Sequence, residues 1–382
     1  MTDWKKIRKD FPAAENVVYF VSAGMSPIPT PVFERMVSEY RKLNQHGDVG
    51  WQEDIAKKRE LYAGVGKLIN AKPGDMAFMQ NTSLSMSMIA LSLKNNACKK
   101  YNVVSMLDEF PATTVPFEYI GTEMKYVSPV SSRYSIESIL SLVDEDTMAV
   151  VTSYVQYATG FRQDLAKLGA ELKKRNILFI VNATQGFPIF PIDVERMHID
   201  AMSASLHKWG MAGLVGAIFY TSEKFRERFP TPIAGWLSVH PDEGDFIYTE
   251  KNAHPEIYDS AAQFDIGSSN LQGINSFGAA FEYMSSIDFG RMRERIFSLS
   301  DILIRGLSKL PVRIVSPVAD PDERSASTSF SVGEKSKELV SYLSNRKILV
   351  SYRGGNIRVA INIFNDEGDI EKLLDAVGDF IR

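Results

Sequence analysis

The stretch that decides the fold is Ile177–Tyr220, ILFIVNATQGFPIFPIDVERMHIDAMSASLHKWGMAGLVGAIFY. Its three apolar runs are 177–181, 201–204 and 215–220. Short continuous apolar runs bounded by turn residues are typical of strands that are covered on both faces. The stretch therefore predicts three buried strands of one sheet.

Polar side chains follow the second of these strands, namely Ser205, His207 and Lys208. In open α/β sheets, ligands bind at the carboxyl ends of the strands. A lysine at that edge can form a Schiff base with a carbonyl cofactor such as pyridoxal phosphate, whose pyridine nitrogen also needs a partner. Asn182, at the end of the preceding strand, is a candidate for this partner.

Upstream of this stretch, strand and helix patterns alternate from residue 76 onward. MAFMQ, VVSML and TMAVVTSYV predict strands, and the segment after Asn81, SIESILSLV and DLAKLGAELKKR predict helices. Such alternation predicts an α/β fold, with a mostly parallel sheet covered by helices on both faces. Since no GxGxxG motif follows any of these strands, a dinucleotide-binding fold is not supported.

The chain divides into three predicted parts. Residues 1–265 form a large cofactor-binding domain, 266–310 form linking helices with a break near Asp288, and 311–382 form a small C-terminal α+β domain. Whether the N-terminal segment packs on the small domain is left open. The segment 230–267, rich in Gly, Pro and aromatic residues, predicts a long functional loop or interface.

Composition limits the function classes. The net charge of -4 argues against a nucleic-acid or anionic-membrane surface, and no apolar run is long enough for a membrane span. The first residues lack the apolar core of a signal peptide. With one cysteine, Cys98, the chain can form no internal disulfide, so we expect a cytoplasmic protein. No metal site is expected.

Several further motifs support a family resemblance. In chain order they are VYFVSAGMSPIP (18–29), NTS (81–83), DEFP (108–111), SYVQYATG (153–160), NATQ (182–185), SASLHKWG (203–210), GSSN (267–270) and RGGNIRVAINIFND (353–366). This series resembles the class V aminotransferase branch of the fold-type-I pyridoxal-phosphate enzymes, which includes cysteine desulfurases, kynureninase and isopenicillin-epimerase-like proteins. The resemblance covers nearly the whole chain. It implies a homodimer with a shared active site that acts on an amino acid or a primary amine.

The resemblance assigns a cofactor role to nine residues. Lys208 forms the Schiff base and moves the proton at the substrate α-carbon. The phosphate is bound at a helix N-terminus, where free N–H groups and the helix dipole favour an anion. The other cofactor contacts are Thr82, Ser83, Ser205 and His207 (phosphate), Ser268 (phosphate of the partner subunit), Phe110 (ring stacking), Gln185 (phenolic oxygen) and Asn182 (pyridine nitrogen).

Substrate contacts are implied by the same resemblance. Arg358 matches the arginine that binds the substrate α-carboxylate in a bidentate fork, with Arg353 and Arg162 as alternatives. Gln156 and Tyr157 end a strand and both could reach the pocket. Because side chains alternate along a strand, only one of these two can point inward.

Two features depart from the family pattern, one residue and one missing residue. Asn182 stands where the family normally has an aspartate, whose charge keeps the pyridine nitrogen protonated. No cysteine follows Cys98, so the persulfide-forming mechanism of the desulfurases is not expected. An aminotransferase is the family default. A C–S (β) lyase or an epimerase without a persulfide cysteine, and a catalytically weak cofactor-binding protein, remain alternatives.

Overall fold

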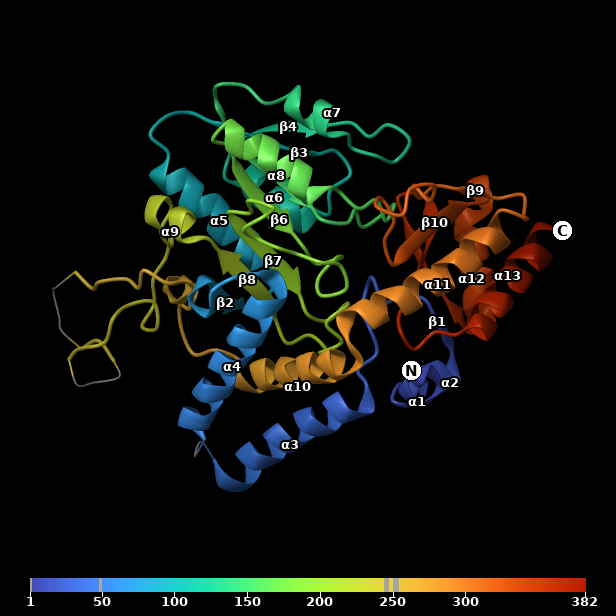
Figure 1. The fold of residues 1–382 in the computed structure, drawn as a ribbon, viewed down its shortest axis with the longest axis horizontal. Coiled ribbons are helices and arrows are strands. Elements are labelled where there is room, and N and C mark those ends of the chain that lie inside the picture. Colours follow the sequence, from blue (N-terminus) through green and yellow to red (C-terminus); the bar gives the residue numbers. More distant parts are fainter. Residues whose placement is uncertain (1, 48–49, 244–246, 250–253) are drawn as a thin grey trace.

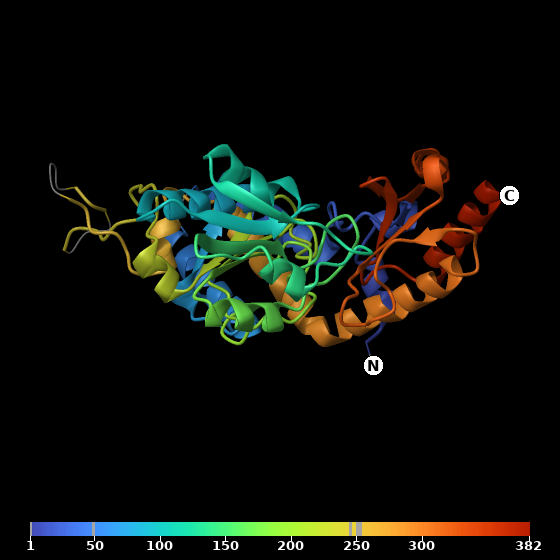
Figure 2. The ribbon, with the colours of Figure 1, turned by 90° about the horizontal axis from the view of Figure 1, so that it is seen from above.

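The structure is a computed structural model that describes residues 2–47, 50–243, 247–249 and 254–382. A larger part surrounds a seven-stranded sheet, and a smaller part holds the C-terminal strands and helices (Figures 1 and 2). Helix α10 (Leu271–Ile287) packs in the larger part against α3 (Thr30–His46) and α4 (Trp51–Ile69). Helix α11 (Phe289–Leu307) continues into the smaller part and packs against α13 (Glu367–Ile381).

The large sheet has the strand order β2-β8-β7-β6-β5-β3-β4. Neighbouring strands from β7 to β4 run parallel, whereas β8 is antiparallel to β7 and to β2. The prediction of a mostly parallel sheet is therefore confirmed. The strands are β2 (Met76–Met79), β3 (Asn102–Met106), β4 (Glu123–Val127), β5 (Thr147–Ser153), β6 (Leu178–Asn182), β7 (Ala201–Ser205) and β8 (Ala217–Thr221).

Helices cover both faces of this sheet. Successive side chains of a strand point to opposite faces, and the strand residues are apolar on both of these faces. In β6, Ile180 belongs to the buried cluster that includes apolar residues of α5, α6 and α9. Its neighbour Phe179 belongs to the opposite cluster, which includes residues of α4, α8 and α10. This double burial explains the continuous apolar runs in the sequence. Besides α4 and α10, the covering helices are α5 (Thr82–Asn96), α6 (Pro111–Tyr119), α7 (Ile136–Leu140), α8 (Leu165–Lys174) and α9 (Glu223–Arg228).

The smaller part contains a four-stranded antiparallel sheet with the order β12-β13-β10-β9. The N-terminal segment lies with it, because β1 (Val18–Tyr19) pairs in parallel with β11 (Ile348–Leu349). The boundaries of the domains stay a prediction. The remaining elements are α1 (Trp4–Lys9), α2 (Ala13–Asn16), β9 (Arg313–Ile314), β10 (Ser327–Ser331), α12 (Ser336–Asn345), β12 (Ser351–Arg353) and β13 (Asn356–Ala360).

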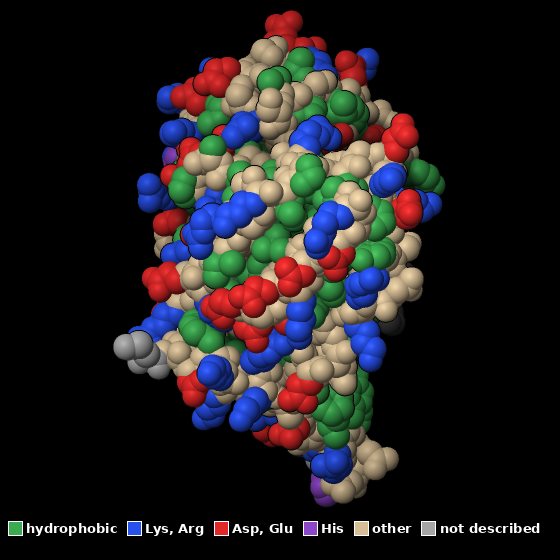
Figure 3. Space-filling model, turned by 90° about the vertical axis from the view of Figure 1, so that its right-hand side faces the viewer, with side chains coloured by type: hydrophobic (Ala, Val, Ile, Leu, Met, Phe, Trp, Pro, Cys, Tyr) green, Lys and Arg blue, Asp and Glu red, His purple; other side chains and the backbone are tan. Residues whose placement is uncertain are grey.

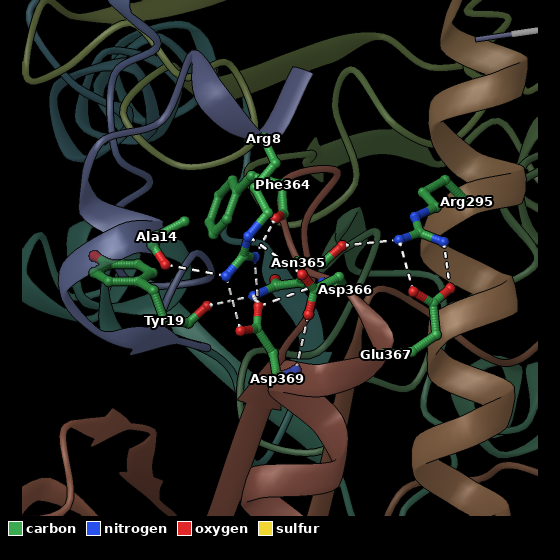
Figure 4. A network of polar contacts seen from close by, with 9 residues as sticks. All are labelled: Arg8, Ala14, Tyr19, Arg295, Phe364, Asn365, Asp366, Glu367 and Asp369. Atoms are coloured by element: carbon green, nitrogen blue, oxygen red, sulfur yellow. Dashed lines mark hydrogen bonds and ion pairs between the residues drawn. The ribbon is translucent and has the colours of Figure 1, made fainter. Parts of the chain in front are cut away.

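Arg8 joins the N-terminal helix to the start of α13 (Figure 4). Its guanidinium donates to both carboxylate oxygens of Asp369, at 2.8 and 3.0 Å, and to the carbonyl of Phe364 at 2.6 Å. Asp369 also accepts from the Asn365 side chain at 3.0 Å, whereas Asn365 donates a second bond to the carbonyl of Tyr19. Two ends of the chain that are far apart in sequence are thus held together by one buried carboxylate.

Some elements were not predicted, among them α6, β4 and α9. The predicted break between the linking helices is confirmed at Asp288, whose φ of 84° cannot continue a helix. Its side chain accepts from the Arg291 N–H and so caps α11. The segment 230–267 is mostly irregular where it is described, and residues 244–246 and 250–253 of it lie outside the described residues.

The outer surface is mixed in charge at the C-terminal end of the molecule. Figure 3 shows Lys and Arg side chains intermingled with Asp and Glu side chains over this face. Among the described helices, none is long and apolar enough to cross a membrane.

Candidate active site

A cavity of about 300 Å³ lies between the carboxyl edge of the large sheet and the β12–β13 hairpin of the small one. Strands β5 and β6 run in register here, so that Ser153 and Asn182 end side by side. Most of the predicted site residues line this cavity together. The lining residues are Ala23, Gly24, Asn81, Thr82, Ser83, Phe110, Ala112, Ser153, Tyr157, Asn182, Thr184, Gln185, Ser205, His207, Lys208, Arg353 and Arg358.

Lys208 follows β7 and points toward the Phe110 ring, with its Nζ 5.4 Å from the ring centroid. Burial, and after it the nearby Arg358 and Arg353 guanidinium groups, together lower the pKa of Lys208 to about 8. A lysine with such a pKa has far more neutral amine at pH 7 than an exposed one. Lys208 is therefore suited to attack a carbonyl group.

Hydroxyl groups surround the N-terminus of α5. Asn81 caps this helix by accepting from the Leu84 N–H at 2.9 Å. Thr82 Oγ1 lies 2.8 Å from Ser205 Oγ and 3.2 Å from Thr184 Oγ1, which in turn accepts from the Ser205 N–H. Ser83 is exposed at the first turn of the helix. These hydroxyls and the free N–H groups of the helix start form a neutral cradle for an anion such as a phosphate.

His207 borders the same cavity and is half-buried. Burial, and after it the charge of Lys208, together lower the pKa of His207 to about 4. The imidazole is therefore neutral at pH 7, and it can bind an anion only as an N–H donor.

The amide of Asn182 has a defined orientation. Its Oδ1 accepts from the Thr184 N–H at 3.1 Å, which identifies the oxygen, and its Nδ2 donates to Thr113 Oγ1 at 2.9 Å. Asn182 is 5% exposed. The second N–H of the Asn182 amide remains to donate to a ligand. This position therefore offers a neutral donor in place of a carboxylate.

Gln185 is held in a similar way. Its Oε1 accepts from Trp209 Nε1 at 3.0 Å, and its Nε2 donates to the carbonyl of Ala23 at 2.9 Å. The second Nε2 hydrogen is available for the predicted contact with the cofactor's phenolic oxygen. Phe110 is 41% exposed and meets Tyr157 edge to face, with ring centroids 5.4 Å apart.

Two arginines enter the cavity from the hairpin. Arg358 is 2% exposed, its Nη1 donates to the carbonyl of Tyr157 at 2.6 Å, and its Nε has no partner among the described residues. Burial lowers the pKa of Arg358 to about 10, with repulsion from Arg353 as the next cause. A buried guanidinium with unused donors is suited to bind a carboxylate.

Three predicted contacts are not brought to the cavity. Gln156 points away from it and donates to Glu109 at 2.8 Å, because Tyr157 takes the inward position at the end of the strand. Ser268 is exposed and lies outside the cavity lining. Arg162, an alternative to Arg358, donates instead to the carbonyls of Arg324 and Pro321.

Other residues of the site were missed from the sequence. Thr184 lies inside the quoted NATQ turn, so its polar neighbours were a signal for it. Ser153 and the buried Glu109, which accepts from the Ser153 N–H at 2.6 Å, pin the end of β5 to the segment before Phe110. Thr113, the partner of Asn182, lies on the unpredicted helix α6.

The cavity fits pyridoxal phosphate in most respects. It combines a lysine of lowered pKa, a neutral anion cradle, an aromatic ring and two arginines, and among the described lining residues none is Asp or Glu. The exception is Asn182, which cannot supply the charge that a protonated pyridine nitrogen needs. Within the described residues, no group of three or more His, Cys, Asp or Glu side chains could hold a metal ion.

A parallel-sheet α/β fold with a reactive lysine at its carboxyl edge defines the class of the fold-type-I pyridoxal-phosphate enzymes. Within this class, the chain belongs to the class V aminotransferase family, whose model matches residues 18–373. The family prediction and the cofactor prediction of pyridoxal phosphate are both confirmed at this level.

Relatives and solved structures agree with this assignment. A probable cysteine desulfurase of Pyrococcus abyssi is 23% identical over 98% of this chain and 97% of its own. The apo structure of the Thermococcus onnurineus cysteine desulfurase has a TM-score of 0.90, with 22% identity over 100% and 98% of the two chains. The cystine C–S lyase C-DES has a TM-score of 0.86, with 19% identity over 97% and 99%. At such identities the structural likeness shows the fold.

Proposed function

We propose that this chain is a pyridoxal-phosphate enzyme that cleaves the bond between the β-carbon and its substituent in an α-amino acid. The observation that carries the proposal is the cavity itself, where the amine of Lys208 and the buried Arg358 share a space without any described carboxylate. This arrangement matches the two ends of an amino acid, its reacting α-carbon and its carboxylate. The relatives named as desulfurases, and the neighbour named as a C–S lyase, support cleavage over transamination.

The sulfur chemistry of a desulfurase with an acceptor thiol does not fit this chain. Its one cysteine, Cys98, is exposed and follows the last turn of α5, the helix whose first turn borders the cavity. A helix of 15 residues is about 22 Å long at ~1.5 Å per residue. A sulfur-containing leaving group would therefore depart as a small molecule and not as an enzyme persulfide.

Each residue of the cavity has a part in the proposed reaction. When bound, pyridoxal phosphate supplies an electron-withdrawing ring that stabilises negative charge at the substrate α-carbon. Lys208 would hold the cofactor through its carbonyl carbon, and its amine would accept the proton of the substrate α-carbon. Arg358 would orient the carboxylate, and Phe110 would cover the cofactor ring. The cradle of Thr82, Ser83, Thr184, Ser205 and His207 would hold the phosphate.

The proposed reaction balances as a β-elimination. The α-carbon loses a proton, and the bond from the β-carbon to its substituent breaks with both electrons leaving on the substituent. The substituent takes up a proton, and water releases the rest as pyruvate and ammonia. Transamination is the second candidate, because it is the general activity of the family. The neutral Asn182 disfavours it, because in transamination the charge of the α-carbon has to be stabilised until a proton is returned, whereas in elimination the leaving substituent takes that charge away.

Product analysis separates these possibilities. Purified protein loaded with pyridoxal phosphate is given a panel of amino acids with sulfur or oxygen substituents on the β-carbon. Cleavage gives pyruvate and the free substituent, transamination gives a keto acid and pyridoxamine phosphate, and epimerisation gives only loss of optical activity. A visible cofactor band without turnover would mean a binding protein of weak activity. Cys98→Ala should react like the wild type, whereas loss of sulfur release in this variant would contradict the proposal.

We further infer that the enzyme works as a cytoplasmic homodimer with a shared site. Ser268 is exposed and outside its own cavity, which fits a contact made in a partner subunit. Light scattering tests the assembly. In a dimer, Ser268→Ala should weaken cofactor binding, whereas a monomer that binds the cofactor fully would contradict this inference.

A further inference from the structure

The two cavity arginines have fixed positions relative to each other. In the β12–β13 hairpin, Ser351 is opposite Arg358 and Arg353 is opposite Asn356. Arg353 and Arg358 are therefore diagonal neighbours on one face of the hairpin, a position in which Cα atoms are typically about 7–8 Å apart. The turn between the strands is Gly354-Gly355, with φ of 54° and 78°. Two positive φ values at the centre of a two-residue turn give the tight hairpin that glycine favours, so this spacing is set by the backbone.

Both guanidinium groups keep unused donors. Within the described residues, the Arg353 side chain makes one hydrogen bond, from Nη1 to the carbonyl of Tyr352 at 2.7 Å, and the Arg358 side chain makes one, to the carbonyl of Tyr157. Neither makes an ion pair with a carboxylate in the described part of the chain. Each guanidinium carries five N–H donors. Two like charges that face the same cavity repel each other, and this repulsion is relieved only when anions bind.

One bound amino acid with an uncharged side chain supplies one anion to this wall. Its α-carboxylate occupies a single guanidinium, because the arginine–carboxylate fork is bidentate. The cofactor's phosphate has its own neutral cradle at the start of α5, on the opposite wall. An amino acid without an acidic side chain would thus leave one of the two arginines without an anion.

We propose that the substrate carries a second acidic group, which Arg353 binds at the mouth of the cavity while Arg358 binds the α-carboxylate. The difference in burial decides which acidic group each arginine binds, because Arg358 is 2% exposed and Arg353 lies at the solvent-exposed end of β12. The substrate class is therefore an α-amino acid whose leaving substituent carries an acidic group, such as a carboxylate or sulfonate, at its far end. This inference rests on the proposed function, which places an amino acid at Lys208.

Binding of unreactive acids tests the proposal without turnover. Succinate and butyrate have the same carbon chain, but succinate carries a second carboxylate. We expect the loaded wild-type enzyme to bind succinate about tenfold more tightly than butyrate at low salt, as measured by calorimetry. Arg353→Gln should bind the two acids equally. The matched control is Arg346→Gln, because Arg346 is exposed on a Tyr342 ring outside the cavity and its loss should preserve the preference.

Substrate selectivity provides the second measurement. S-carboxymethylcysteine has an anionic side chain and S-propylcysteine a neutral one of similar length, and both would release a thiol by β-elimination. The ratio of their kcat/KM values should exceed about ten in the wild type and approach one in Arg353→Gln. A wild type that prefers the neutral substrate, or a variant that keeps the ratio, would overturn the proposal. Failure of the wild type to take up pyridoxal phosphate would instead overturn the proposed function, so the two failures are distinct.

Discussion

The two walls of the cavity differ in charge and in how many of their hydrogen bonds are already made within the protein. The wall from the large sheet is neutral, and its polar groups bond to one another, as Thr82, Thr184 and Ser205 do. The hairpin wall is cationic, and Arg353 and Arg358 keep donors that have no partner among the residues the structure describes. A wall whose hydrogen bonds are already made has a fixed shape before any ligand arrives. A wall with unpaired charge reaches its lowest energy only with an anion bound.

This difference suggests a division of labour between resident and transient ligands. The neutral wall suits a cofactor that stays in place, since fixed donors need little rearrangement to bind it. The cationic wall suits a substrate that enters and leaves, because its charges attract acids from solution. Lys208 stands between the two walls. Changes to the lysine, to the cationic wall and to the neutral wall should therefore have separate signatures.

The largest effect is expected for Lys208→Ala, which removes the group that both walls serve. Turnover should fall by at least about 10³-fold, because the covalent attachment and the proton transfer are lost together. The neutral wall is intact in this variant, so pyridoxal phosphate should still bind reversibly. Absorbance and dialysis measure this binding. Lys100→Ala, which removes an exposed lysine paired with Glu123, is the control and should behave as the wild type. Turnover near the wild-type rate in Lys208→Ala would rule out this lysine as the reactive amine.

Arg358→Gln comes next and isolates the cationic wall. KM for amino acids should rise by about 10²-fold, the value of a charge-assisted bidentate contact. Arg358→Lys should recover only part of this loss, because an ammonium group cannot form the two-pronged contact. Cofactor affinity should stay unchanged.

The matched change on the neutral wall is Thr184→Val, which keeps the shape of the side chain and removes its hydroxyl. This variant should lose cofactor affinity and retain the KM of the wild type. If both variants changed the same constant, the division between the two walls would be wrong. Steady-state kinetics and cofactor titration of the two variants decide this.

The sequence predicts more of the neutral wall than of the cationic wall. The apolar runs before Asn182 and Lys208 predict strands, and parallel strands bring their carboxyl ends to one edge, so the neutral wall follows from local patterns. Thr113 does not, because Pro111–Tyr119 starts with a proline and contains another, Pro116, a composition that hides a helix.

The cationic wall depends on contacts that no local pattern contains. Strand β13 of the hairpin at 351–360 pairs with β10, and Ala360 at its end forms a bridge with Val21. Contacts between these distant parts of the chain hold the hairpin at the cavity. Family resemblance predicted Arg358 as the carboxylate-binding arginine and left Arg162 and Arg353 as alternatives. The choice between Gln156 and Tyr157 was likewise open, because strand alternation shows that one of the two points inward but not which one.

Asn182→Asp tests how neutral the sheet wall has to be. The carboxylate would accept from the Thr184 N–H and the Thr113 hydroxyl, so the fold should tolerate the change. With a negative charge at this position, we expect the cofactor's pyridine nitrogen to become protonated and transamination to rise by about tenfold relative to cleavage. The nitrogen chemical shift of labelled cofactor reports the protonation, and product ratios report the partition. An unchanged shift would mean that residue 182 does not face the nitrogen.

The pH dependence of cofactor attachment is expected to show the smallest effect, and it measures the influence of the cationic wall on Lys208. The pKa of Lys208 is lowered to about 8, first by burial and then by Arg358 and Arg353. Only the neutral amine attacks, so the rate at which apo-protein forms its visible band should rise about tenfold per pH unit below 8 and level off above it. Arg358→Gln removes one repelling charge, so it should move the midpoint upward. Burial remains the larger cause, and the midpoint should stay below the ordinary lysine value. Thr184→Val removes no charge and should leave the midpoint in place. A midpoint equal in all three proteins would mean that the arginines do not influence the lysine, and the two walls would then act independently.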